Sequence, residues 1–419
     1  MAMQVLVILV QVMSRPNSTP EECAKVRWDV VIIGAGPAGS LAAVLLSREK
    51  LKVLLVDRQI FPRQKVCGCC LNGNAVTALE DSGLSHLLTD HKAVALDEMC
   101  LGSLGLSETF PLQRQMVLSR ERLDFSLIQE AINAGACFLE DTLAELGELE
   151  MEFRQVRLKW AGREYSTTAR VVIAADGLGG RLLVRKNITC HIPSRNTKIG
   201  AGVILEASPD FYRSGKLFMA CGKGGYIGLV RLEDGRLDLA AAMDPPMIKK
   251  HGSTGLFAKA LLQEMGWPVP ENMEIAPWRG TPALTGQIAK VFDERLFVIG
   301  DAAGYIEPFT GEGMAWALSG AKLLVPLVLR AVHSWEKKLG TQWQNLHRKC
   351  IKKRQGFCKF MSMLLKWPRL VQTSIVCLKW FPSLSSLFIS ILDKPSPAAN
   401  VCQGNEHESL FFRLGKRSS

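Results

Sequence analysis

The 419-residue chain lacks several patterns that would place it in a simple class. Its twelve cysteines do not follow the regular spacing of a disulfide framework, which favours a reducing, cytoplasmic location. No run of eighteen purely apolar residues occurs, so a conventional membrane span is not predicted. The apolar start has no positively charged n-region and no small-residue cleavage site, which indicates that residues 1–26 are an N-terminal extension rather than a signal peptide.

Familiar catalytic and metal-binding patterns are also missing. None of the seven histidines stands in a Ser-His-Asp or paired-carboxylate arrangement. Cys67 and Cys70 form one CxxC pair, but no second pair or Cys/His cluster follows within a short span, so no metal site is predicted. Residues 330–369 hold eleven Lys or Arg and one acidic residue, against a net charge of +11, so the rest of the chain is nearly neutral. Such local basicity does not indicate a nucleic-acid partner.

What the chain does contain is a nucleotide-binding βαβ pattern at residues 28–58, "WDVVIIGAGPAGSLAAVLLSREKLKVLLVDR". Gly34 permits the tight turn after the first strand, Gly36 lets backbone amides approach a pyrophosphate, and Gly39 lets helix and strand pack closely. Asp57 ends the second strand, where a carboxylate can accept both ribose hydroxyls. That acid favours an unphosphorylated ribose and therefore FAD or NAD rather than NADP.

A second glycine-rich segment, residues 295–321, decides between these two nucleotides. Its strand ends at Gly300 and Asp301, and a carboxylate there can accept hydrogen bonds from a polyol chain, which FAD has and NAD lacks. A Pro/Gly loop follows, in which Gly311 and Gly313 allow close backbone approach before a helix that begins near Thr310 and is capped by it. A third segment, residues 170–185, runs from a strand into Asp176 and Gly177.

These three motifs together resemble the FAD-dependent oxidoreductases of the p-hydroxybenzoate hydroxylase fold, over about residues 28–330. The resemblance implies an α/β fold in which a Rossmann-like FAD-binding domain (27–185 and 285–330) is interleaved with an antiparallel substrate-binding β-sheet (186–284). It also implies that NAD(P)H or a protein donor reduces the flavin, because no second Rossmann fingerprint is present. The predicted remainder is a basic helical cap (331–393) and a disordered tail (394–419).

The cysteine-rich segment "FPRQKVCGCCLNG" resembles the flavin loop of the geranylgeranyl reductase branch, whose pattern is Lys-Pro-Cys-Gly-Gly-Gly. A redox dithiol between Cys67 and Cys70 remains an alternative interpretation. From the two resemblances and the nucleotide motifs we predict the following FAD contacts: Gly34, Gly36, Pro37, Ala38, Gly39, Asp57, Arg58, Cys67, Gly68, Cys70, Arg120, Asp176, Gly177, Gly300, Asp301, Gly311, Gly313 and Met314.

Residues 224–243 alternate like a β-hairpin that would roof the flavin and form a substrate chamber. Geranylgeranyl reductases carry Tyr-x-Trp-x-Phe-Pro there, whereas this chain has "YIGLVR", which keeps Tyr226 but not the rest. Flavin halogenases carry Trp-x-Trp-x-Ile-Pro, which is also absent. We predict Cys67 and Tyr226 as catalytic candidates, although a sheet tyrosine held by the backbone is an equal interpretation for Tyr226.

The basic segment carries Trp335, Trp343, Trp367 and Trp380 among its lysines and arginines. Basic amphipathic helices with interfacial tryptophans suit an anionic membrane surface, so peripheral membrane attachment is one expectation and a solvated helical cap is the other. The predicted function is an FAD-dependent oxidoreductase acting on a hydrophobic substrate of prenyl, lipid-like or polyketide type. The alternatives are an aromatic monooxygenase and a prenyl-binding protein without redox chemistry.

Overall fold

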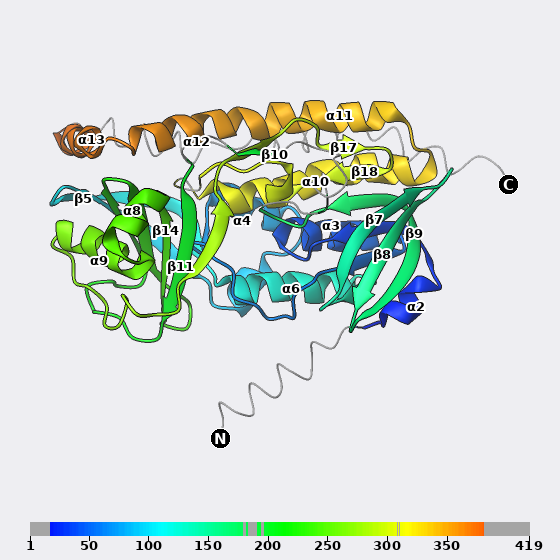
Figure 1. Ribbon diagram of the computed structural model, residues 1–419, viewed down its shortest axis with the longest axis horizontal. Helices are drawn as coiled ribbons and strands as arrows, with labels where there is room; N and C mark the ends of the chain where they lie inside the picture. Colours follow the sequence, from blue (N-terminus) through cyan, green and yellow to red (C-terminus); the bar gives the residue numbers. More distant parts are fainter. Residues whose placement is uncertain are drawn as a thin grey trace, which may run out of the picture.

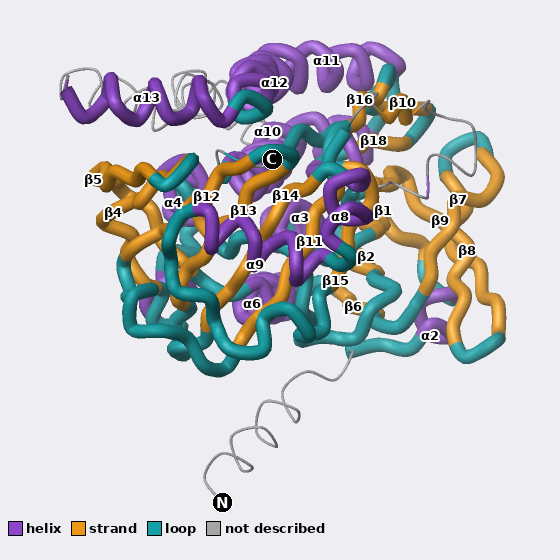
Figure 2. Tube along the Cα trace, turned by 60° about the vertical axis from the view of Figure 1, so that its left-hand side comes forward, coloured by secondary structure: helices purple, strands orange, loops and turns teal. Residues whose placement is uncertain are grey.

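The computed structural model describes residues 17–178, 182, 191–193, 197–307, 309 and 311–380. Two eight-stranded sheets dominate these residues, one in each half of an elongated molecule, and a row of C-terminal helices lies along both (Figure 1). Figure 2 shows the strands of the two sheets gathered in separate groups, with helices between and above them.

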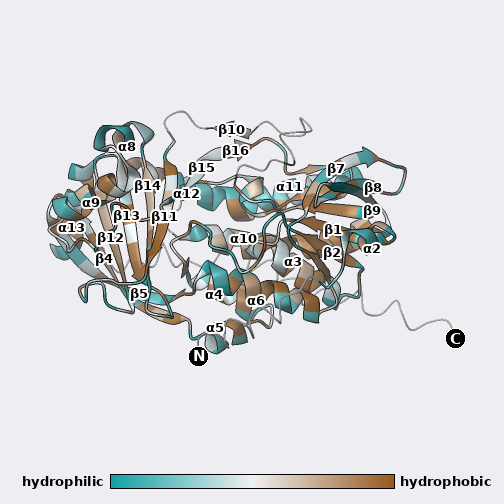
Figure 3. Ribbon diagram, turned by 60° about the horizontal axis from the view of Figure 1, so that its bottom comes forward, coloured by the Kyte–Doolittle hydropathy of each residue, from teal (hydrophilic) through white to brown (hydrophobic). Residues whose placement is uncertain are grey.

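The first sheet is formed from the most apolar segments of the chain. Its central strands β1 (Arg27–Ile33), β2 (Val53–Val56) and β9 (Arg163–Ala174) pair in parallel, and their buried ends read as continuous Val, Ile and Leu runs (Figure 3). The order continues in parallel to β6 (Cys137–Leu139) on one side and to β18 (Leu296–Val298) on the other. Three antiparallel strands complete it, β7 (Leu143–Leu149), β8 (Arg154–Trp160) and β17 (Phe292–Asp293).

Helices α3 (Pro37–Arg48), α6 (Arg120–Asn133) and α10 (Glu312–His333) pack as a layer with this sheet, α3 lying between the other two. Among the described residues, α10 alone is long and apolar enough to cross a membrane, and most of its apolar window is buried inside the fold. Its contacts with α3, with α4 (Gly73–Glu80) and with the 3-10 turn η1 (Gly300–Ala303) explain that burial, because α10 serves as the core helix of this half.

The second sheet carries the predicted hairpin, β13 (Gly225–Arg231) and β14 (Leu237–Met243), and the expected strand β11 (Ile199–Leu205). It extends through β15 (Arg279–Ala283), β12 (Lys216–Gly222), β4 (Val94–Ser103), β5 (Leu106–Val117) and β3 (Cys70–Leu71). The predicted boundaries differ here, because β3, β4 and β5 come from the 27–185 range assigned to the FAD-binding domain. All pairs are antiparallel except β4 with β12, which run parallel.

Helices α8 (Pro245–His251) and α9 (Thr254–Glu264) lie on the second sheet, and α9 side chains form a hydrophobic core with one of its faces. The other face looks toward the first sheet and toward the C-terminal helices. The short elements α5 (His86–Asp90) and the pair β10 (His191–Pro193) with β16 (Gly286–Ile288) complete the description.

The C-terminal cap consists of α11 (Lys337–His347), a π-helical turn (Arg348–Lys352), α12 (Lys353–Leu364) and α13 (Pro368–Trp380). One prediction about it was wrong. Trp343 is fully buried and donates its indole N–H to the carbonyl of Val298 at 3.0 Å, so it cannot face a membrane. Trp335 is half-buried against Phe297. Trp367 and Trp380 are exposed as expected.

The N-terminal boundary also differs from the prediction of an extension over residues 1–26. Helix α2 (Pro20–Ala24) begins with a capping box in which Thr19 and Glu22 satisfy each other's backbone amides. Cys23 is buried in the main core, and its carbonyl accepts hydrogen bonds from the Trp28 indole and the Thr167 hydroxyl. Residues 20–26 are therefore part of the fold, whereas 1–16 and the tail at 394–419 lie outside the described residues.

Candidate active site

The turn between β1 and α3 is fitted to its glycines. A Cβ on Gly34 would lie 2.3 Å from the carbonyl oxygen of Ala175, and Gly34 has a φ of +109°. A Cβ on Gly39 would lie 1.9 Å from the carbonyl oxygen of Gly34, so this glycine lets helix and turn meet. Gly36 is the N-cap of α3 and offers no side-chain cap, which leaves the first amides of the helix available to an anion.

Asp57 is held beside this turn at the end of β2. Its two carboxylate oxygens accept the backbone amides of Ala35 at 2.8 Å and of Gln59 at 2.9 Å. Arg63 lies with its Nη2 atom 3.7 Å from carboxylate oxygens of both Asp57 and Asp124. The acidic group predicted for a ribose is thus buried, oriented and paired with a cation, while Arg58 is exposed.

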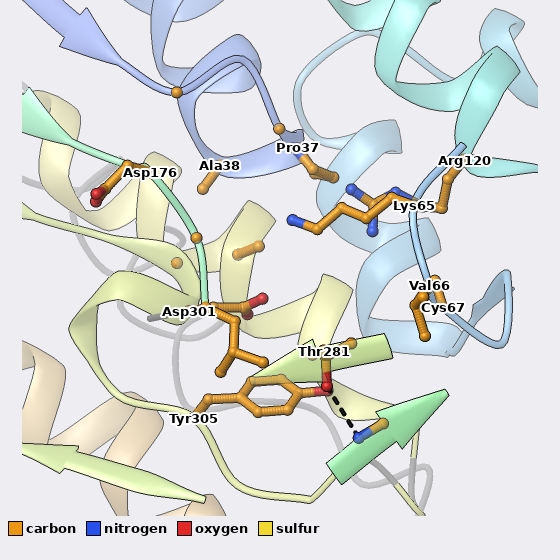
Figure 4. Close-up of a pocket in the computed structure, with 18 of the residues that line it drawn as sticks. Pro37, Ala38, Lys65, Val66, Cys67, Arg120, Asp176, Thr281, Asp301 and Tyr305 are labelled. Atoms are coloured by element: carbon orange, nitrogen blue, oxygen red, sulfur yellow. Dashed lines mark hydrogen bonds between the residues drawn. The ribbon is translucent and has the colours of Figure 1, made fainter. Parts of the chain in front are cut away.

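The two later strand ends arrive at the same place. β9 and β18 are parallel neighbours, so Asp176 with Gly177, and Gly300 with Asp301, emerge at one edge of the first sheet. Figure 4 shows Asp176 and Asp301 on the strand ends facing the same hollow, with Pro37 and Ala38 at the start of α3 opposite them. Loss of solvent inside the hollow raises the pKa of Asp301, and the nearby Lys65 and Arg120 oppose that rise.

The cysteine loop forms the far wall. Lys65, Val66, Cys67 and Arg120 lie together on that side of the hollow (Figure 4). Arg120 is buried and makes a bidentate ion pair with Asp124, with nitrogen–oxygen distances of 2.9 and 2.8 Å, and the Cys67 sulfur lies next to its guanidinium. Burial and the adjacent Arg120 lower the pKa of Lys65, whose ammonium points into the hollow.

Cys69, unlike its two neighbours, faces away from this hollow. It is buried with a φ of +52°, and the carboxyl group of Asp238 lies beside its thiol. Loss of solvent raises the pKa of both Cys69 and Cys70, which disfavours a reactive thiolate at either position. Among the described residues, no group of three or more His, Cys, Asp or Glu side chains is placed to hold a metal ion.

One continuous cavity of about 860 Å³ connects these segments to the second sheet. Of the predicted FAD contacts it is lined by Gly34, Gly36, Pro37, Ala38, Asp57, Arg58, Cys67, Gly68, Cys70, Arg120, Asp176, Gly177, Gly300, Asp301, Gly311, Gly313 and Met314. Gly39 is outside the lining because it packs beneath the turn. Helix α10 begins at Glu312 with Gly311 in the cap position, and Thr310, predicted to cap it, lies outside the described residues.

The part of the cavity against the second sheet is mostly apolar. Leu217, Met219, Val230, Leu284 and Phe309 line it together with Tyr226. Gly228, which stands where geranylgeranyl reductases carry tryptophan, also lines it and leaves that volume open. The chamber that the hairpin was predicted to roof therefore exists, and it is wider than the family signature would make it.

Three cavity residues were missed by the sequence analysis. Arg63 and Lys65 stand in the segment quoted for its cysteines, where two cations next to a nucleotide motif were a usable signal. Tyr305 follows Gly304 directly, and its ring reaches from the Asp301 turn towards Thr281 on β15 (Figure 4). No spacing rule indicated Tyr305, because its place depends on how η1 meets the second sheet.

A sequence profile of the FAD binding domain family matches residues 27–334, and the chain belongs to this family. It is therefore an FAD-dependent oxidoreductase by class. Digeranylgeranylglycerophospholipid reductase 2 of Methanothermobacter thermautotrophicus is 26% identical, over 77% of this chain and 86% of its own. Menaquinone reductase of Mycobacterium tuberculosis is 26% identical over 83% of this chain and 86% of its own. Conditioned medium factor receptor 1 of Dictyostelium discoideum is 24% identical over 92% and 78%.

Solved structures show the same fold. A flavin-dependent brominase superposes with a TM-score of 0.73 at 17% identity, covering 92% of this chain and 100% of its own. A protein of Pseudomonas aeruginosa, titled a probable FAD-dependent monooxygenase, gives a TM-score of 0.64 at 17% identity, with 84% and 100% covered. The predicted fold class is confirmed, and at these identities the likeness concerns the fold alone.

Proposed function

We propose that this protein is an FAD-dependent reductase of a prenyl or other lipid-like chain, with NAD(P)H or a protein as the electron donor. The observation that carries the proposal is the single cavity, which is polar and glycine-lined at the first sheet and apolar at the second. A dinucleotide and a hydrophobic chain can meet in it without leaving the protein. Relatives named as reductases of a digeranylgeranyl lipid and of menaquinone support this substrate class.

The chain's own residues fit FAD at several points. The free amides at the start of α3 suit the pyrophosphate, and Asp57 suits the adenosine ribose. Asp301 suits the ribityl chain, and the cations Lys65 and Arg120 suit the electron-rich edge of a reduced ring. When bound, FAD supplies the hydride chemistry, and these residues hold and orient it while the apolar chamber excludes water.

The test is anaerobic reduction of the purified, FAD-bound protein by NADH and by NADPH. Product analysis then follows with digeranylgeranylglycerophospholipid, menaquinone and a simple phenol in parallel. A saturated prenyl product without oxygen supports the proposal. Oxygen uptake matched to NAD(P)H with a hydroxylated phenol would instead select a monooxygenase, for which the chamber's lack of polar anchoring groups gives no specific support.

The exposed face of α12 and α13 supports membrane attachment as part of this function. Large apolar side chains there are exposed, namely Phe360, Met363, Trp367, Leu370 and Trp380. Lysines and arginines are exposed among them, at Lys352, Lys353, Lys359, Lys366 and Arg369. An apolar face within a basic rim suits an anionic lipid surface, and α13 packs on β4, β5 and β12 of the substrate sheet. Docking there would bring a lipid substrate close to the chamber.

Vesicle flotation tests this attachment. We expect the protein to float with phosphatidylcholine vesicles that contain phosphatidylserine, and less with phosphatidylcholine alone. Trp367→Ser combined with Trp380→Ser should abolish flotation, whereas Trp160→Ser, at an exposed tryptophan on β8, should not change it. Equal flotation of both variants would exclude this face as the attachment site.

A further inference from the structure

A buried ion pair outside the predicted FAD contacts lies behind the substrate chamber. The Nζ atom of Lys198 is 3.3 and 3.4 Å from the two carboxylate oxygens of Glu307, and the two side chains are 3% and 6% exposed. Lys198 precedes β11, and Glu307 lies in the loop between η1 and α10. Because a buried ion pair rarely stabilises a fold more than apolar residues of similar size, its presence calls for another reason.

Tyr226 connects this pair to the chamber. Its ring lines the cavity and meets Phe309 edge-on at a centroid distance of 5.3 Å. Its hydroxyl is buried and makes no well-formed hydrogen bond with any residue in the described part of the chain. Among the charged groups, Glu307 acts on it most strongly, and burial together with that carboxylate raises the pKa of Tyr226 well above its ordinary value. The tyrosine thus stands between the substrate space and Glu307.

Glu307 is set to retain a proton. Burial raises its pKa, and Lys198 opposes that rise without cancelling it. The titratable and charged groups that face the carboxyl come from several elements: Lys198, Asp244, Lys366, Tyr226, Tyr305 and Cys221. Lys366 is exposed, so the site has a polar neighbour at the protein surface through which a proton can be replaced.

We propose that Tyr226 is the proton donor to the substrate and that Glu307, with its charge balanced by Lys198, restores the proton on Tyr226. This rests on the proposed reductase function. One carbon of the double bond receives hydride from the reduced flavin, and the other receives the Tyr226 hydroxyl proton, so the product gains two hydrogens. The Tyr226 phenolate then takes the proton of the Glu307 carboxyl, and the resulting carboxylate, stabilised by Lys198, is reprotonated from solvent.

A structural role for the pair is the competing explanation. Lys198 and Glu307 join the second sheet to the loop that follows Asp301, so the pair could serve to hold that loop in place. That role predicts loss of stability when one charge is removed and recovery when both are removed. It predicts neither a pH-dependent limb in the rate nor any response of Tyr226 to the ionisation of Glu307.

The first experiment needs no substrate. The chain has four tyrosines, so labelling tyrosine Cζ with ¹³C gives four resonances, which Tyr→Phe variants assign in the FAD-bound protein. We expect the Tyr226 resonance to shift with pH at a midpoint above the ordinary glutamate range, and Glu307→Gln to remove that shift. A Tyr226 resonance that is unchanged by Glu307→Gln over the whole range would overturn the relay.

The second experiment follows reoxidation of the reduced flavin by digeranylgeranylglycerophospholipid. We expect Tyr226→Phe to slow this step by about 100-fold and Glu307→Gln by about 10-fold, with flavin reduction by the donor unchanged. In the wild type the rate should fall as pH rises through the raised pKa of Glu307. Glu307→Asp should retain such a limb, and Glu307→Gln should lose it.

The double variant Lys198→Met/Glu307→Gln separates the two explanations, because it leaves no unpaired buried charge. Reoxidation at the wild-type rate in this variant would overturn the relay in favour of a structural clamp. If the wild type does not reduce the lipid although the Tyr226 resonance follows Glu307, the reductase function fails while the Tyr226–Glu307 coupling stands. If the lipid is reduced without that coupling, the relay alone fails.

Discussion

Asp238 makes a quantitative prediction about stability beneath the cysteine loop. It lies on β14, is 5% exposed, and one of its carboxylate oxygens has no hydrogen-bond partner within the described residues. Burial raises its pKa from 3.8 to about 8, and the Cys69 thiol and Arg236 only partly oppose the rise. The folded protein therefore holds a proton on Asp238 over a pH range in which the unfolded chain has released it.

The sign follows from proton linkage. Between the unfolded and folded pKa values the native state binds one more proton, so the free energy of unfolding falls as pH rises. The slope from this one group is about 1.4 kcal/mol per pH unit, or roughly 3 kcal/mol between pH 5 and pH 7. Above pH 8 its contribution is constant.

Asp238→Asn keeps the shape of the side chain and cannot ionise. We expect the variant to gain about 3 kcal/mol relative to wild type on going from pH 5 to pH 7. Urea unfolding of the FAD-saturated protein at several pH values measures this difference directly. Asp210→Asn, at an exposed aspartate, serves as the matched control and should follow the wild type. Parallel curves for Asp238→Asn and wild type from pH 5 to pH 8 would refute the assignment of a buried, protonated aspartate.

Three further predictions concern the cavity. Gly39→Ala places a methyl group 1.9 Å from the Gly34 carbonyl oxygen, so the protein should purify without yellow FAD and lose about 1–3 kcal/mol or more of stability, while Gly356→Ala, with no atom within 4 Å of its added methyl, should keep its flavin absorbance. Gly228→Trp should fill the chamber and raise KM for the lipid by about 10-fold with FAD still bound, since a lost apolar contact of this size is worth 1–3 kcal/mol; an unchanged KM would show that substrate does not reach β13. Cys70→Ser should leave flavin reduction unchanged, because a thiol with a raised pKa is a poor redox partner, and loss of electron transfer in stopped-flow absorbance would restore the dithiol interpretation.

The sequence alone predicted the nucleotide half of the molecule well, and the reason is local. A β-branched run, a glycine turn and a small-residue helix specify β1 and α3 within about thirty residues, and backbone geometry at Gly34 and Gly39 permits few alternatives. Parallel strands place their carboxyl ends at one edge of a sheet, so Asp57, Asp176 and Asp301 could be expected to converge without a structure.

The rest depended on contacts between distant segments, for which no periodicity exists. Cys69 and Cys70 have the same neighbours in sequence, yet a left-handed backbone at Cys69 turns it towards Asp238 while Cys70 faces the cavity. Trp343 and Trp367 sit among similar lysines, but only the packing of α11 against β17 and β18 buries the first. Lys198 and Glu307 are 109 residues apart and meet only because two sheets close on one cavity. Local sequence thus determined where a nucleotide can lie, and tertiary packing decided which charges are buried beside the substrate.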